Sequence, residues 1–216
     1  MIEIIPAINS QTFDDVKARI ERVQDYTRWI HLDVADGTFT KNILWHEPEE
    51  LAQWTRSNPN HPLIEVHLMI KNPEMAVPKW IAAGAKRIIV HVETITDFIR
   101  LKKMCDDARV FLMLSIAPET PVSALDPYFD KSIVCFQVLA VNPGLPGQSF
   151  IESSYDKLAY IRRKCPHCDL EIDGGVKVGI AKKCKDAGAN LFVSASAIFD
   201  SEDINGAIEW LRSDVK

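Results

Sequence analysis

The sequence lacks the features that carry a chain into or across a membrane. No uncharged apolar stretch approaches the roughly 20 residues that span a bilayer, and Met1 to Pro6 hold no basic segment leading into a long apolar run. Charges of both signs are intermixed, with a formal net charge of −5, so no basic block marks a surface for nucleic acid or anionic lipid. We therefore expect a protein that is neither secreted nor membrane-inserted and that binds no nucleic acid.

The sequence also lacks a disulfide framework. Its five cysteines are odd in number and scattered, which favours a reducing compartment, and the cytoplasm is the simplest one. Cys165 and Cys168 have the spacing of half a zinc knuckle, but a second cysteine pair is missing from the sequence. We interpret this segment as a connection between a helix and a strand.

Low-complexity segments and linkers are missing as well. The chain has 216 residues, of which 47% are hydrophobic, and this length falls within the range of one domain with one large core. We expect a single catalytic domain over residues 1–216, whose natural partner is a small molecule.

Short apolar runs rich in β-formers alternate with amphipathic segments along the whole chain, a pattern typical of repeated βα units. The strands are apolar almost throughout, as buried parallel strands are. The predicted strands cover residues 2–9, 29–34, 63–70, 87–93, 110–116, 133–141, 170–173 and 191–196, and the clearest helices cover 13–23 and 154–163. Eight such units, each strand followed by a helix, predict an α/β protein with a (β/α)8 TIM-barrel fold. A doubly wound parallel sheet is the alternative.

Polar residues at the ends of three predicted strands are the first candidates for a site. His31 and Asp33 share one face of their strand by its period of two, and His67 and Asp173 lie near the ends of two others. Buried charges need partners, and a divalent cation would satisfy all of these groups. Two imidazoles and two carboxylates suit zinc, iron(II), manganese or cobalt. Alternatively, the histidines are hydrogen-bonded core residues and the aspartates cap loops.

Three late loops hold small residues that let backbone N–H groups approach an anion closely, and barrels commonly bind phosphate after strands seven and eight. Ordinary tight turns would give the same composition. The candidate residues are Gly144, Leu145, Pro146, Gly147, Gly174, Gly175, Ala195 and Ser196.

Several motifs, in this order and at this spacing, resemble the ribulose-phosphate 3-epimerase family over nearly the whole chain. They are Ile5-Pro6-Ala7-Ile8, His31-Leu32-Asp33-Val34-Ala35-Asp36-Gly37, Val66-His67-Leu68-Met69, Val141-Asn142-Pro143-Gly144 with Gly147-Gln148-Ser149-Phe150, Glu171-Ile172-Asp173-Gly174-Gly175, and Ser196-Ala197-Ile198-Phe199.

This resemblance implies a (β/α)8 barrel that interconverts ribulose 5-phosphate and xylulose 5-phosphate. It implies a metal held by His31, Asp33, His67 and Asp173, with the two aspartates also acting as acid and base on opposite faces of the sugar. His67 and the eight small-loop residues named above would contact the phosphorylated ketose. The family also favours a homo-oligomer.

The reaction fits that arrangement. Inverting C3 of a 2-ketose removes a proton next to a carbonyl and returns one to the opposite face, with an enediolate in between. A cation stabilises the negative charge as it develops. The chemistry needs neither a redox cofactor nor an organic one.

Four positions depart from the family pattern, namely Ala7 for a serine, Ala35 and Leu139 for methionines, and Ala195 for a glycine; of the family's methionines over the metal only Met69 is kept. These changes predict a roomier pocket, with Ala195 narrowing its phosphate end. A hexulose phosphate such as allulose 6-phosphate is therefore an alternative substrate.

Two further alternatives stay open. One is a decarboxylase or aldolase of the same superfamily, which would resemble a pattern with a catalytic lysine, and the other is a non-catalytic barrel that binds a sugar phosphate. His91 and Glu93, at the end of the fourth predicted strand, are expected to hydrogen-bond to a metal ligand rather than to bind metal directly.

Overall fold

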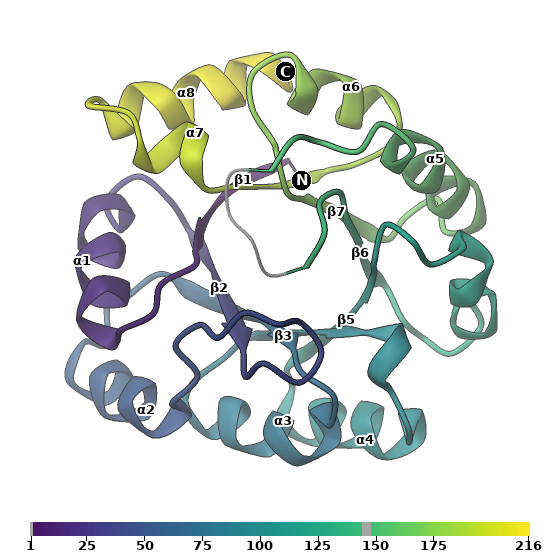
Figure 1. The fold of residues 1–216 in the computed structure, drawn as a ribbon, viewed down its shortest axis with the longest axis horizontal. Helices are drawn as coiled ribbons and strands as arrows, with labels where there is room; N and C mark the ends of the chain where they lie inside the picture. Colours follow the sequence, from purple (N-terminus) through teal and green to yellow (C-terminus); the bar gives the residue numbers. More distant parts are fainter. Residues whose placement is uncertain (1, 144–147) are drawn as a thin grey trace.

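The computed structural model describes residues 2–143 and 148–216, which form a closed barrel of eight parallel strands in the order β1 to β8. Helices surround the strands in an outer ring (Figure 1). The strands are β1 (Glu3–Ile8), β2 (Trp29–Ala35), β3 (Leu63–Met69), β4 (Arg87–His91), β5 (Phe111–Ile116), β6 (Cys135–Leu139), β7 (Asp169–Asp173) and β8 (Leu191–Ser194). The helices are α1 (Phe13–Val23), α2 (Pro48–Ser57), α3 (Pro73–Ala82), α4 (Phe98–Ala108), α5 (Ser154–Lys164), α6 (Ile180–Asp186), α7 (Ser196–Phe199) and α8 (Ile204–Asp214). The predicted TIM-barrel fold is confirmed.

Two connections differ from the expected repeat. After β5 the chain forms the 3-10 helix η2 (Val122–Tyr128) in place of an α-helix. Pro121 begins this segment and Pro127 lies inside it, and a proline in a helix interior removes a backbone donor and clashes with the preceding turn. After β4, the predicted strand end instead forms the short 3-10 helix η1 (Val92–Thr94).

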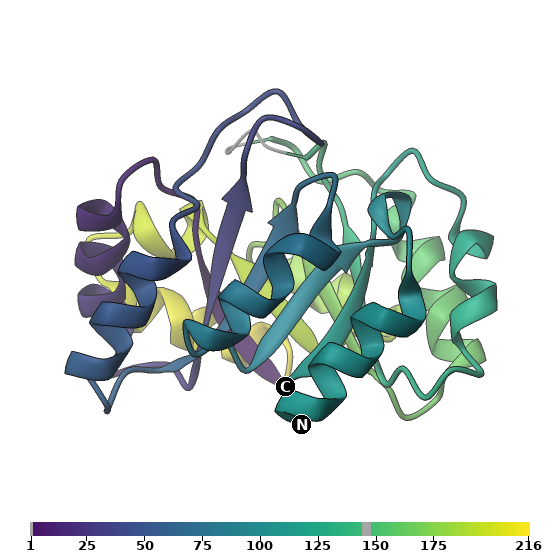
Figure 2. The same ribbon diagram turned by 90° about the horizontal axis from the view of Figure 1, so that it is seen from below.

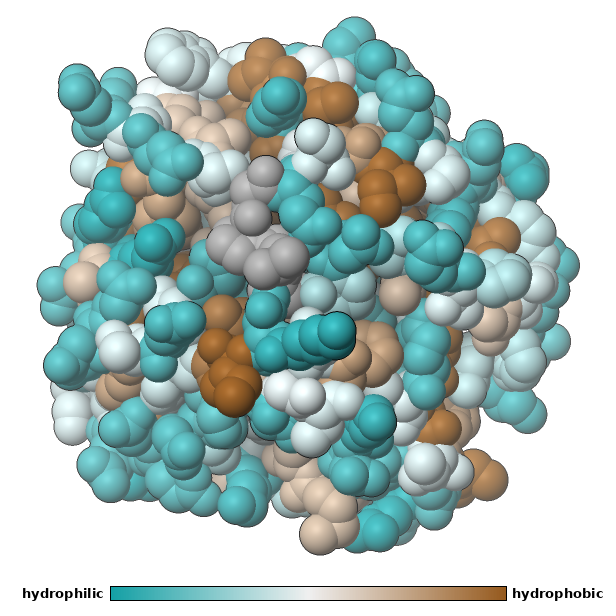
Figure 3. Space-filling model, viewed as in Figure 1, coloured by the Kyte–Doolittle hydropathy of each residue, from teal (hydrophilic) through white to brown (hydrophobic). Residues whose placement is uncertain are grey.

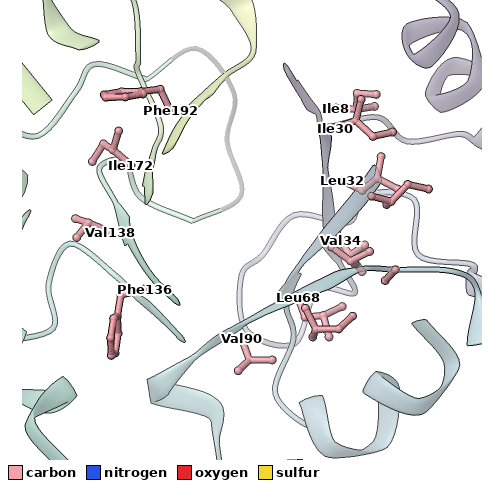
Figure 4. Packing of buried hydrophobic residues seen from close by; sticks show 14 of the residues in the cluster. Ile8, Ile30, Leu32, Val34, Leu68, Val90, Phe136, Val138, Ile172 and Phe192 are labelled. Carbon is pink, nitrogen blue, oxygen red and sulfur yellow. The ribbon is translucent and has the colours of Figure 1, made fainter. Parts of the chain in front are cut away.

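The alternation of side chains along the strands divides the core into two parts. Side chains on the outer face of the barrel pack against the helices, and Figure 4 shows some of them, including the labelled Leu32 on β2, Phe136 on β6 and Phe192 on β8. Side chains on the inner face form a smaller apolar cluster that includes Ile5, Met113 and Val193. Most of the buried polar residues of the strands also occupy inward positions, and these positions build the site.

The carboxyl ends of the strands and the loops that follow them lie at one end of the barrel, and both chain termini lie at the other (Figure 2). The loop between β2 and α2 rises over this end, where the Thr40 hydroxyl donates to the Pro143 carbonyl at 3.0 Å. Figure 3 shows this face covered largely by hydrophilic side chains, with hydrophobic ones scattered among them. Among the described residues, no helix is both long and apolar enough to cross a membrane.

Candidate active site

Parallel pairing of the strands brings together the four residues that the sequence singled out. Asp33 on β2 is the register partner of His67 on β3, and His31 lies two residues before Asp33 on the same inward face. His67 Nδ1 lies 3.2 Å from Asp33 Oδ1 and 3.4 Å from Asp173 Oδ2. His31 Nε2 lies 3.3 Å from Asp33 Oδ1, 3.7 Å from Asp173 Oδ2 and 3.3 Å from His67 Nδ1. Four potential ligand atoms therefore converge from three strands.

Burial and charge act against each other in this group. Burial alone lowers the pKa of His31, but hydrogen bonds to Asp33 and Glu65 and the charge of Asp173 outweigh it and raise that pKa well above its ordinary value. The pKa of His67 is raised by the two aspartates in the same way. Burial tends to raise the pKa of Asp33, but the two imidazoles lower it overall. The surroundings therefore favour positive charge between ionised carboxylates.

The ring nitrogen of His31 that faces away from this group has its own partner. Nδ1 lies 2.7 Å from Glu65 Oε1, and both side chains are fully buried. The other oxygen of Glu65 accepts a hydrogen bond from the Arg87 guanidinium. Burial tends to raise the pKa of Glu65, but Arg87 and His31 lower it overall, so this carboxylate is ionised and Nδ1 is the donor.

A second buried glutamate, Glu171 on β7, has different contacts. Its Oε1 accepts from the Gln137 amide at 2.9 Å, and its Oε2 has no hydrogen-bond partner among the described residues. Arg87 Nη1 lies 3.5 Å from Oε2. Burial, followed by the charge of Glu65, raises the pKa of Glu171 well above its ordinary value.

His67 is supported by a different chain of contacts. Its Nε2 lies 2.9 Å from His91 Nε2, and His91 Nδ1 lies 3.3 Å from Glu93 Oε2. Glu93 Oε1 accepts from the backbone N–H of Ala117 at 2.9 Å. Burial lowers the pKa of His91, so its ring is neutral, accepting at Nε2 and donating from Nδ1 to Glu93. His67 therefore donates through Nε2, and its Nδ1 faces the two aspartates.

These residues fit a divalent metal. One ligand atom from each of His31, Asp33, His67 and Asp173 lies within 4.8 Å of the others. The two imidazole nitrogens facing inward are the ones not occupied by Glu65 or His91, as expected when ligating histidines donate their other N–H to a neighbour. Nitrogen and carboxylate donors together suit transition metals.

A cavity opens above this group at the mouth of the barrel. It is partly open to solvent, so a small ligand can reach the four candidate ligand residues from this end. Asp33 and Asp173 line it together with apolar side chains. Three of the four departures from the family pattern, Ala7, Leu139 and Ala195, also line it. The fourth, Ala35, is instead buried in a small cluster with Leu44 and Met69.

The late loops form the wall of this cavity nearest to β7 and β8, where Gly174, Gly175, Ala195 and Ser196 lie. Gly174 and Gly175 have φ values of +98° and +69°. A Cβ on Gly174 would lie 2.5 Å from a methyl of Val141, and one on Gly175 would lie 2.9 Å from the backbone N of Phe150. Both positions therefore require glycine. The candidates Gly144, Leu145, Pro146 and Gly147 lie outside the described residues.

Some residues of the site received no role from the sequence. Asn9, which follows β1, lines the cavity, and so does Val141. Glu65, Arg87 and Glu171 form the buried support below the four candidate ligands. Their signal was present in the sequence, because each is a charged residue within a strand that was predicted to be buried.

Comparison with known proteins agrees with this geometry. The model of the ribulose-phosphate 3-epimerase family matches residues 3–199. The chain belongs to this family. It is 37% identical over 190 residues to ribulose-phosphate 3-epimerase of Escherichia coli, covering 86% of this chain and 83% of that one. It is 35% identical to the chloroplastic ribulose-5-phosphate-3-epimerase of Arabidopsis thaliana, and the match covers 98% of this chain and 76% of that one. It is 30% identical to ribulose-phosphate 3-epimerase of Candida glabrata, and the match covers 99% of this chain and 92% of that one. The resemblance inferred from the motifs is thus confirmed.

Solved structures of other enzymes share only the fold. The 3-hexulose-6-phosphate synthase of Salmonella typhimurium gives a TM-score of 0.75 at 13% identity, covering 99% of this chain and 98% of that one. The 3-keto-L-gulonate-6-phosphate decarboxylase of Vibrio cholerae gives 0.73 at 16% identity, covering 99% and 97%.

Proposed function

We propose that this chain is a metal-dependent ribulose-phosphate 3-epimerase that interconverts D-ribulose 5-phosphate and D-xylulose 5-phosphate. Membership in the family supports an epimerase. The observation that carries the proposal is the pair Asp33 and Asp173, which come from separate strands, β2 and β7, and line one cavity. Both carboxylates also lie against the same two imidazoles, His31 and His67.

The two aspartates are suited to proton transfer on opposite faces of a planar enediolate. One carboxylate removes the C3 proton of one epimer while the other, protonated, delivers a proton to the far face, and the roles exchange in the reverse direction. The lowered pKa of Asp33 supports its role as the base, because the carboxylate is then ionised at neutral pH.

The metal belongs to the same proposal, with His31, Asp33, His67 and Asp173 as its ligands. When bound, a divalent cation supplies Lewis-acid stabilisation of the negative charge that develops on the substrate oxygens. Zinc, iron(II), manganese and cobalt all suit this donor set. The two histidines are held from behind by Glu65 and His91, so the protein fixes their ring orientations before any ligand arrives.

For the phosphate we propose the wall formed by Gly174, Gly175, Ala195 and Ser196. A second hollow continues past this wall and is lined by Gly175, Lys177 and Ser196 among others. The backbone groups and the Lys177 ammonium of this second hollow suit a phosphate better than the apolar side chains of the first cavity do. Binding there anchors the substrate away from its reacting carbon. Contact between the phosphate and residues 144–147 stays a prediction from the sequence.

A hexulose phosphate such as allulose 6-phosphate is a second candidate substrate. The observation that favours it is the lining of the cavity by Ala7 and Leu139, two positions where the family pattern has a serine and a methionine. A decarboxylase or aldolase is disfavoured, because the described residues that line this cavity include no lysine.

The decisive test is turnover by metal-loaded protein on ribulose 5-phosphate, allulose 6-phosphate and free ribulose in deuterated water. We expect fastest turnover of the pentulose phosphate, solvent deuterium at C3 of early product, and very poor turnover of free ribulose. Substrate-derived hydrogen retained at C3 would overturn the two-base mechanism. Binding without exchange at C3 would instead favour the non-catalytic barrel.

We also propose that residues 1–216 act as one catalytic domain in a cytoplasmic homo-oligomer. Family resemblance supports the assembly, and size-exclusion chromatography with light scattering tests it. A monomer at working concentrations would contradict it.

A further inference from the structure

Each histidine of the candidate metal centre has two ring nitrogens, and only one can face the centre. In His31 the inward nitrogen is Nε2, which lies 3.3 Å from Asp33 Oδ1. The other nitrogen, Nδ1, lies 2.7 Å from Glu65 Oε1. His31 and Glu65 are both fully buried, so water does not compete for this hydrogen bond.

Glu65 is itself held in place by a second residue. Its Oε2 accepts a hydrogen bond from Arg87, whose guanidinium also stacks over the Trp29 ring with 4.4 Å between the guanidinium carbon and the ring centroid. The Trp29 contact limits the movement of the guanidinium. Both oxygens of Glu65 are therefore engaged, one by His31 and one by Arg87.

Glu171 is a natural comparison, because it is also a fully buried inward glutamate but on the opposite side of the barrel. Its Oε1 lies 3.9 Å from His31 Nδ1, beyond hydrogen-bond distance, and accepts from Gln137 instead. The same residue type close to the same imidazole therefore lacks the contact that Glu65 makes.

We propose that Glu65, held by Arg87, is the positioning residue of His31. By accepting the Nδ1 proton, Glu65 fixes the tautomer in which the Nε2 lone pair is directed towards Asp33, His67 and Asp173. If the proton sat on Nε2 instead, that nitrogen could not ligate a metal. This inference rests on the proposed metal centre and assigns to Glu65 the control of the metal affinity of that centre.

The test compares zinc affinity in three proteins, namely the wild type, Glu65→Gln and Glu171→Gln, by competition with a chromogenic chelator. The two substitutions make the same chemical change in the barrel interior, and only the first alters the partner of His31. We expect zinc binding on the order of 10- to 100-fold weaker in Glu65→Gln and within about twofold of wild type in Glu171→Gln. Circular dichroism confirms that each protein is folded. Equal affinities in all three proteins, or equal losses in both variants, overturn the proposal.

A second measurement needs no variant. Nitrogen-15 NMR of the zinc-loaded wild type reports which ring nitrogen of His31 carries the proton, and we expect Nδ1. A proton on Nε2 overturns the role of Glu65.

The outcomes also separate this inference from the proposed function. A wild type that takes up none of zinc, iron(II), manganese and cobalt overturns the metal centre and this inference with it. A wild type that binds zinc, with Glu65→Gln binding equally well, overturns only the inference and leaves the epimerase intact.

Discussion

The two histidines of the candidate metal centre are supported in different ways. Behind His31, Glu65 is fully buried and is neutralised by the Arg87 guanidinium. Behind His67, the support runs through neutral His91 to Glu93, whose side chain is 20% exposed near the mouth of the barrel. Both arrangements leave one imidazole nitrogen free to face Asp33 and Asp173.

The difference follows from the cost of burying charge. A carboxylate deep in the barrel has no access to water, so an ionised Glu65 requires a cation in contact with it. Glu93 keeps some access to solvent and is stabilised by the Ala117 backbone N–H and by His91, so it needs no arginine. We therefore expect the support of His31 to be the more sensitive of the two to substitution.

The largest effect is expected from Arg87→Met, which leaves Glu65 buried without its cation. Removing one partner of a buried pair costs about 3–5 kcal/mol, and we expect a loss of this size in the free energy of unfolding. Urea denaturation measures it. Lys103→Met is the control, because it breaks an exposed pair with Asp107 that solvent screens, and we expect the free energy of unfolding to stay close to that of the wild type. A loss below about 1 kcal/mol in Arg87→Met would contradict the comparison.

A smaller effect is expected from His91→Phe on the other side. The substitution removes the acceptor of the His67 Nε2 proton while keeping an aromatic ring against Phe39, whose centroid lies 4.7 Å from that of His91. We expect zinc binding to weaken about 10-fold, the lower end of the range for lost partners of metal ligands. Chelator competition measures the change. Unchanged affinity would show that His67 keeps its orientation without His91.

Much of this arrangement could be predicted from the sequence. The period of two in β-strands places His31 with Asp33 on one face, and the rule that barrel sites lie at the carboxyl ends of strands brings in His67 and Asp173. The same period also places Glu65 inward, two residues before His67. Its role could not be read from the chain, because the stagger of strands around the barrel decides which imidazole it meets.

The same limit applies to Arg87 and Glu171, which lie on β4 and β7 and meet only across the closed barrel. Prediction of the fold was limited in a similar way. The number and order of the strands could be predicted from the periodicity of the sequence. The 3-10 helix η2 could not, because it depends on the local effect of two prolines, which competes with the repeated βα pattern.

The acid side of the stability profile offers a third test, on Glu93. Burial tends to raise its pKa, but His91 and backbone and hydroxyl donors lower it from 4.5 to about 2. Because the folded-state pKa is below the unfolded one, ionised Glu93 stabilises the fold above about pH 4.5, and this contribution is lost as the pH falls towards about 2. At neutral pH we expect the free energy of unfolding of the wild type to exceed that of Glu93→Gln by about 1 kcal/mol. This difference is smaller than the pKa shift alone gives, because solvent screens a partly exposed carboxylate.

Urea denaturation of both proteins between about pH 6 and about pH 3 measures this difference, which should shrink as the pH falls. A difference that stays constant over this range would remove Glu93 from the support of His67.

The smallest effect is expected at Ser115 on β5, which lies next to the support of His67. Ser115 is the register partner of His91 on one side and of Gln137 on the other, and it is fully buried. Its hydroxyl has no hydrogen-bond partner among the described residues, so neither support passes through it. Ser115→Ala removes an unpaired polar atom and nearly preserves side-chain volume. We therefore expect the free energy of unfolding and the zinc affinity to stay within about 0.5 kcal/mol of wild type. A loss above about 1 kcal/mol in both the free energy of unfolding and the zinc affinity would contradict this expectation. It would instead indicate that a water bound at this hydroxyl links the supports of His31 and His67 into one network.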